Sequence, residues 1–106
     1  MRHWVYVDQV KFFGTGRYEL LQRIAETGSI SQAAKDMGLS YKKAWAMVDA
    51  MNTLGKNPYV VTQKGGSKGG GTVVTETGKK VLEAYKKLND KLLAVVVAEK
   101  ELLEVV

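Results

Sequence analysis

The feature that most restricts the possible folds is a pair of short helical segments joined by a glycine turn in residues 28–55. Ser29 begins an S-x-x-Q pattern that is typical of a capping box at a helix N-terminus. Gly38 tolerates the positive φ that a tight turn requires, and Ser40 is placed to cap the helix that follows. The small side chains at positions 33 and 34 allow the two helices to cross closely.

The second helix, expected from Tyr41 to about Leu54, has two dissimilar sides. Its buried side is predicted to carry apolar residues at i, i+4 and i+7 spacing, namely Ala44, Val48 and Met51. The opposite side then carries Tyr41, Lys42, Lys43, Ala46 and Asp49. The two lysines fall in the first turn, where exposed backbone N–H groups also attract phosphate. This arrangement is typical of a helix-turn-helix that reads a DNA groove, and the alternative is a helical hairpin with a solvated lysine pair.

Two residues of this helix leave alternatives open. Asp49 could accept a hydrogen bond from a cytosine amino group, or it could keep phosphate away. Trp45 falls between the buried and the outward sides of the helix, and tryptophan at helical spacing is more often a packing residue than a DNA contact.

Two short β-prone runs, residues 59–62 and 72–75, flank a loop rich in glycine and lysine, QKGGSKGGG. This spacing predicts a hairpin whose mobile tip carries Lys64 and Lys68. The loop lacks the GxxxxGK[ST] pattern of a nucleotide-binding P-loop. Beside a basic helix, the hairpin is expected to lay its lysines along a phosphate backbone or into a minor groove. By itself it would be an inert flexible hairpin.

The positive charge of the chain is concentrated in this region. The net charge is +5 and the pI is about 9.5. Residues 35–80 hold eight basic side chains against three acidic ones, whereas the segments before and after are nearly balanced. A cationic surface formed by the two-helix unit and the hairpin favours an anionic partner.

The remaining segments complete the order of elements. Residues 3–13 are expected to form one edge strand, with Trp4, Tyr6, Val10 and Phe12 on one side. A helix should follow from Arg17 to Thr27 and end at Gly28, and Thr75 can cap a long last helix. That helix has a heptad pattern, Val81, Tyr85, Leu88, Leu92, Val95, Leu102 and Val106, interrupted by Glu99.

This order predicts a mainly α fold with a small β-hairpin (α+β), a winged helix-turn-helix in one domain, residues 1–106. The wing spans about 59–75 and a C-terminal dimerisation helix about 76–104. The first turns of the last helix could pack on the chain's own first helix. Beyond Leu92 a helix rising about 1.5 Å per residue outruns so small a domain, so its apolar seam favours a second chain.

The run GSISQAAKDMGLSYKKAWAMVDAMNTL, the loop GGSKGGG and the run VVTETGKKVLEAY resemble the N-terminal DNA-binding domain of ModE-type molybdate-responsive transcriptional regulators. The first run is similar, more loosely, to LysR-type winged helices. The resemblance covers roughly residues 17–90. It implies a homodimer formed through the first and last helices, whose recognition helices read a two-fold-symmetric DNA operator.

The resemblance and the residue patterns together give two sets of candidate residues. The candidate DNA contacts are Ser29, Ser31, Ser40, Tyr41, Lys42, Lys43, Ala46, Asp49, Lys64 and Lys68. The candidate dimer contacts are Leu21, Tyr85, Leu88, Leu92, Val95 and Leu102. We expect double-stranded DNA and a second copy of the chain as partners, and repressor-type regulation.

Family members continue into C-terminal molybdate-binding domains, which follow the long helix and which this sequence does not contain. We therefore expect no cofactor and no molybdate response through this polypeptide, and no small-molecule effector site is visible in its sequence. Three alternatives stay open: regulation by another effector, regulation by a partner, or no regulation. The absence of cysteine and the shortness of the longest apolar run, residues 92–98, favour a cytoplasmic protein with no membrane partner.

Two other classes of function fit the sequence less well than DNA binding does. A protein-interaction or assembly module could use the heptad helix without binding specific DNA, but it would have no need of a cationic hairpin. An enzyme is not expected, because the one histidine, His3, lies at the terminus and no nucleophile and base are placed together.

Overall fold

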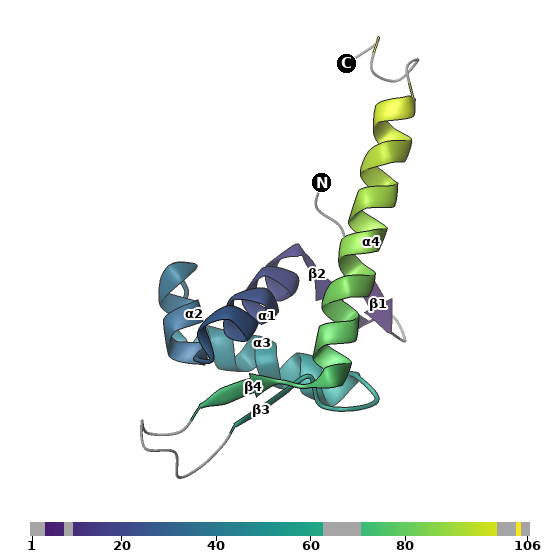
Figure 1. The fold of residues 1–106 in the computed structure, drawn as a ribbon. Helices are drawn as coiled ribbons and strands as arrows, with labels where there is room; N and C mark the ends of the chain where they lie inside the picture. The colour runs from purple at the N-terminus through teal and green to yellow at the C-terminus, as the bar shows by residue number, and fades with distance from the viewer. Residues whose placement is uncertain (1–3, 8–9, 63–70, 100–103, 105–106) are drawn as a thin grey trace.

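The computed structural model describes residues 4–7, 10–62, 71–99 and 104 of the chain. The elements follow one another as strands and helices with these bounds: β1 Trp4–Val7, β2 Val10–Gly14, α1 Thr15–Thr27, α2 Ile30–Asp36, α3 Tyr41–Leu54, β3 Val60–Thr62, β4 Thr72–Val74 and α4 Glu76–Ala98. Helices α1, α2 and α3 pack together, the β3–β4 hairpin lies below them in Figure 1, and α4 rises beside them. The predicted mainly α class with a small β component is confirmed.

The N-terminal segment differs from the single edge strand that the sequence predicted. It forms a separate antiparallel hairpin of β1 and β2, with a register shift between Val5 and Tyr6. Val5 pairs with Phe13 across the strands, and both side chains pack on the core. The single alternating face predicted along residues 3–13 does not apply, because strand alternation is reset where the chain reverses and again where the register shifts.

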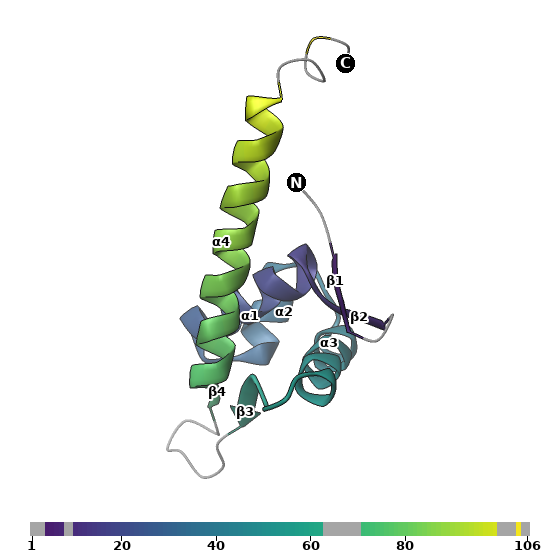
Figure 2. The ribbon, with the colours of Figure 1, turned by 90° about the vertical axis from the view of Figure 1, so that its right-hand side faces the viewer.

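The core joins α4 to the rest of the chain through aromatic rings. Phe13 of β2 contacts Tyr85 of α4 edge-on, with ring centroids 5.0 Å apart. Tyr18 of α1 lies 5.1 Å from Tyr85, again between centroids. The first half of α4 is therefore held against α1 and β2 by large buried surfaces. Its second half projects beyond the other elements, as Figure 2 shows.

The last helix ends at Ala98, before the expected residue 104, and Glu99 at its C-cap has a non-helical backbone. A carboxylate at this end is unfavourable, because the helix macrodipole places partial negative charge there. Among the residues that the structure describes, no helix is both long and apolar enough to cross a membrane.

The first turn of α4 lies unusually close to the base of the β3–β4 hairpin. A Cβ added at Gly78 would lie 2.5 Å from the carbonyl oxygen of Tyr59 and 2.6 Å from Cγ1 of Val74. The contact with backbone can be relieved only by moving the helix or the hairpin, so only glycine fits here.

We expect Gly78→Ala to lower the free energy of unfolding by about 1–3 kcal/mol through overpacking, in spite of alanine's better helix propensity. Gly71→Ala is the matched control, because a Cβ there would have nothing within 4 Å. Urea denaturation followed by circular dichroism measures both. Equal stability of the two variants would show that the close approach relaxes without cost.

Candidate nucleic-acid interface

The start of α2 is fixed by local hydrogen bonds that the sequence predicted in part. The backbone N–H of Gln32 donates to the hydroxyl of Ser29 at 3.0 Å, as in a capping box. The side chain of Gln32 does not reach back to Ser29 and instead donates to Asp36 at 2.8 Å. The hydroxyl of Thr27 accepts the N–H of Ser29 in its place, at 3.2 Å.

The turn between α2 and α3 sets how the second helix is presented. Gly38 has φ +67°, the left-handed region that glycine adopts without strain. The N–H of Leu39 then donates to the carbonyl of Ala34 at 2.9 Å. The hydroxyl of Ser40 accepts the N–H of Lys43 at 3.0 Å and caps α3. The glycine turn and the serine cap agree with the sequence prediction.

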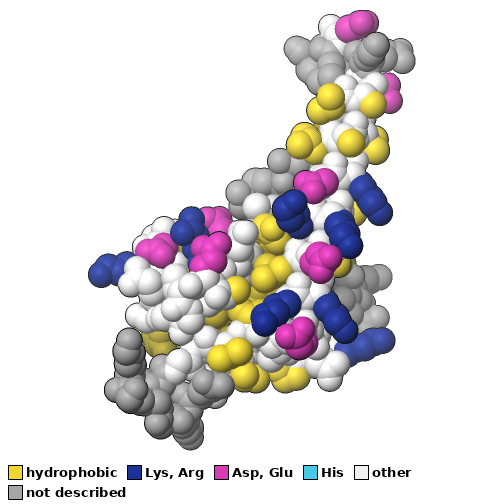
Figure 3. Space-filling view, in the orientation of Figure 1, with side chains coloured by type: hydrophobic (Ala, Val, Ile, Leu, Met, Phe, Trp, Pro, Cys, Tyr) yellow, Lys and Arg dark blue, Asp and Glu magenta, His cyan; other side chains and the backbone are white. Residues whose placement is uncertain are grey.

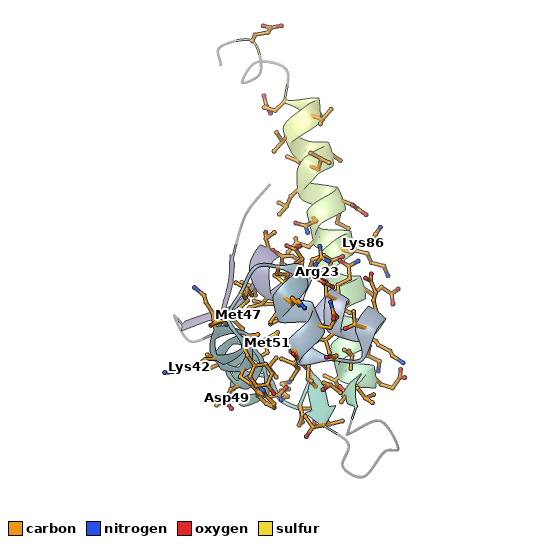
Figure 4. The ribbon with its side chains drawn as sticks, turned by 90° about the vertical axis from the view of Figure 1, so that its left-hand side faces the viewer. Arg23, Lys42, Met47, Asp49, Met51 and Lys86 are labelled. Carbon is orange, nitrogen blue, oxygen red and sulfur yellow. The ribbon has the colours of Figure 1, made fainter. Side chains whose placement is uncertain are left out.

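Helix α3 buries one side and exposes the other, as its apolar spacing predicted. Ala44, Val48 and Met51 are at most 1% exposed. The exposed side includes Tyr41, Lys42, Lys43, Ala46 and Asp49. Figure 4 shows Lys42 and Asp49 directed outwards from α3 and Met51 directed towards the other helices. Ser31 is also exposed, whereas Ser29 is half-buried and both Ser29 and Ser40 serve as helix caps.

Lys42 and Lys43 of α3 differ in their partners from three of the five lysines of α4. On α4, Lys79, Lys86 and Lys87 form ion pairs with Glu76, Asp90 and Glu83, at 3.3–3.5 Å. Lys42 and Lys43 make no ion pair with any residue in the described ranges. Their charge is therefore available to an external anion, next to the backbone N–H groups of the first helical turn.

The position of Trp45 settles whether it belongs to the core. Its side chain is 36% exposed and lies edge-on to Tyr41, with ring centroids 6.2 Å apart. Tyr41 itself is 54% exposed. The two rings form an apolar border along one edge of the outward side of α3, and Trp45 is an edge residue that the core does not enclose.

The predicted hairpin is present as β3 and β4, paired antiparallel with Val60 opposite Val74. These two valines are buried, and their neighbours Val61 and Val73 face outwards. The N–H of Thr72 donates to the carbonyl of Gly28 at 3.0 Å, which ties β4 to the start of the two-helix unit. Lys64 and Lys68, the predicted contacts at the hairpin tip, lie outside the described residues.

Asn52 of α3 connects this helix to the hairpin, and the sequence analysis missed it. Its side-chain oxygen accepts the N–H groups of Tyr59 at 2.8 Å and of Val60 at 3.2 Å. Its side-chain nitrogen donates to the carbonyl of Val60 at 2.9 Å. The only signal in the sequence was an asparagine near a helix end, shortly before an Asn-Pro turn and a strand. That signal is weak, although an amide side chain can both donate to and accept from strand backbone.

Tyr59, the first residue after the Asn57-Pro58 turn, is buried. Desolvation raises the pKa of its phenol above the usual value. The ring therefore stays neutral at physiological pH, packed at the base of the hairpin.

The candidate dimer residues divide into two groups. Leu21 and Tyr85 are 0% and 4% exposed, so both belong to the interior of one chain and not to a surface that a second chain can reach. Leu88 is exposed, Leu92 is half-buried and Val95 is exposed, while Leu102 lies outside the described residues. The cause is the Phe13–Tyr18–Tyr85 cluster, which uses the first half of the apolar seam within the chain.

The arrangement offers no metal centre in the described ranges, where no three or more His, Asp or Glu side chains gather. In these ranges it brings together a capped helix whose two first-turn lysines make no ion pair, an aromatic border and a hairpin base. Lysine side chains and the backbone N–H groups of a first helical turn can bind an anion.

No protein-family model matches the chain. Several curated relatives do match it, and three of them are as follows. It is 51% identical to the molybdenum-pterin-binding protein MopB of Rhodobacter capsulatus over 72 residues, 68% of this chain and 27% of that protein. It is 43% identical to the DNA-binding transcriptional dual regulator ModE of Escherichia coli K12 over 79 residues, 74% of this chain and 30% of that protein. It is 46% identical to the molybdenum transport protein ModE of Azotobacter vinelandii over 72 residues, which are 68% of this chain and 27% of that protein. The matched part thus spans less than a third of each relative.

We expect Asn52→Ala to lower the free energy of unfolding by about 1–3 kcal/mol, because two backbone N–H groups of the hairpin would be left without an acceptor. Asn57→Ala serves as the control, since Asn57 is exposed and its side chain forms no hydrogen bond with another residue that the structure describes. Thermal unfolding compares the two. If Asn52→Ala unfolds no earlier than the control, the three hydrogen bonds contribute nothing to stability.

Proposed function

We propose that this chain, which belongs to the ModE-type family of molybdenum-related regulators, is a DNA-binding transcriptional regulator. The match to members of that family covers 68–74% of the chain. The chain's own residues support DNA as the partner. Lys42 and Lys43 stand unpaired, among the described residues, on the first turn of a helix whose other side is buried. This is the observation that carries the proposal, because such a turn offers charge and backbone N–H groups to phosphate.

Helix α3 enters the major groove in the proposed complex. The outward residues Lys42, Ala46 and Asp49 follow one another at spacings of four and three, so they form a single stripe along the helix. Ala46 has little bulk in the middle of the stripe and permits close approach to base edges. The β3–β4 hairpin lies beside α3 and would carry Lys64 and Lys68 to the backbone or the minor groove.

The proposed regulator acts as a homodimer on a two-fold-symmetric operator. The distal half of α4 exposes apolar side chains: Leu88, Leu93, Val95 and Val97. Figure 3 shows hydrophobic side chains, in yellow, gathered around the upper part of this helix. Apolar residues spread around a projecting helix need covering, and a second copy covers them symmetrically. A bound dimer would occupy promoter DNA, so we propose repression as its action.

The lysine pair gives the first test of DNA binding. Lys42→Ala with Lys43→Ala is expected to weaken binding to duplex DNA and to flatten its salt dependence, by about 0.9 in the logarithmic slope for each phosphate that the variant no longer neutralises. Lys86→Ala with Lys87→Ala removes the same charge from α4 and is the matched control. Fluorescence anisotropy over a range of salt concentrations measures both variants. An equal decrease in affinity for the two would mean that net charge, and not α3, binds DNA.

The exposed part of α4 gives the test of the dimer. We expect the wild-type chain to sediment as a dimer at micromolar concentration, and Val95→Glu to shift it towards monomer, because a carboxylate would be buried in an apolar contact. Asn57→Glu adds the same charge in the turn after α3 as a control. A wild-type monomer in sedimentation velocity would remove the dimer and the symmetric operator together.

A further inference from the structure

Asp49 is the one acidic residue on the outward side of α3, and its surroundings leave its charge unneutralised. It is exposed and makes no hydrogen bond or ion pair with any described residue. The acidic residues of α4 at positions 76, 83 and 90 each pair with a lysine. Asp49 lies in the same stripe as Lys42 and Ala46, opposite the buried side of the helix. Figure 4 shows Lys42 and Asp49 directed outwards from α3.

A carboxylate at this place is costly next to a polyanion unless a hydrogen-bond donor meets it. An ionised carboxylate only accepts hydrogen bonds, and phosphates offer it no donor. Base edges in the major groove do offer donors, which are the amino groups of cytosine and adenine. From Lys42 to Asp49 the helix rises about 10 Å, within a groove about 12 Å wide, so one stripe can meet phosphate at one end and a base edge further along.

We propose that Asp49 is a specificity-determining residue that accepts a hydrogen bond from the N4 amino group of a cytosine in each half-site. Cytosine fits better than adenine, because adenine places the N7 acceptor beside its amino group and repels the second carboxylate oxygen. The short side chain of Ala46, one turn earlier, lets Asp49 come near the base edge. The assignment rests on the proposed DNA-binding function and adds to it which base is read.

The test is a selection of duplexes from a pool with a randomised central stretch, carried out with the full chain. Wild type is expected to enrich a sequence with a cytosine at one position of each half-site. Asp49→Ala removes both acceptor oxygens and is expected to lose that preference, by about tenfold in relative affinity for the cytosine-containing duplex over its substituted versions. The other enriched positions should remain.

Glu83→Gln is the matched control, because it removes one negative charge from an exposed site on α4 and should leave the preference intact. Circular dichroism checks that each variant is folded. If Asp49→Ala enriches the same sequence and binds all duplexes more tightly, Asp49 only repels phosphate and the cytosine assignment is overturned. If wild type enriches no sequence, the proposed function itself fails, and the assignment fails with it.

Discussion

The arrangement of the functional elements depends on the peptide backbone of Tyr59, which three elements contact. From α3, the side chain of Asn52 accepts its N–H at 2.8 Å. Its carbonyl accepts the N–H of Thr75 at 2.9 Å, just before α4. Gly78, in the first turn of α4, has no Cβ to push that carbonyl away. Backbone hydrogen bonds in such a junction are short-range and directional, so they fix angles as well as distances.

This junction joins α3, the base of the hairpin and α4 by hydrogen bonds and close packing. The carbonyl of Gly28 adds a further tie, because it accepts the N–H of Thr72 in β4. In the proposed dimer, the contact between the distal halves of α4 would therefore set the distance and the angle between the two α3 helices. A regulator that reads a symmetric site needs this fixed geometry, since half-site spacing must match the spacing of the helices.

Sequence reasoning predicted α3 well and the N-terminal segment poorly. The limits of α3 follow from its cap, Ser40, and from the turn after Leu54, both of which act through neighbours in the chain. The prediction of one strand over residues 3–13 was wrong because the chain reverses within this segment and forms two paired strands with a register shift. Trp45 was left open for a similar reason, since its 36% exposure depends on what packs beside α3.

The sequence by itself determined the local features: the caps at Ser29, Ser40 and Thr75, and the left-handed turn at Gly38. These depend on hydrogen bonds and backbone preferences within four residues. Only the tertiary structure decided that Asn52 holds the hairpin, and that the apolar seam of α4 changes from core to exposed surface after Tyr85. One heptad pattern serves both purposes, because periodicity shows which side of a helix is apolar but not which element covers it.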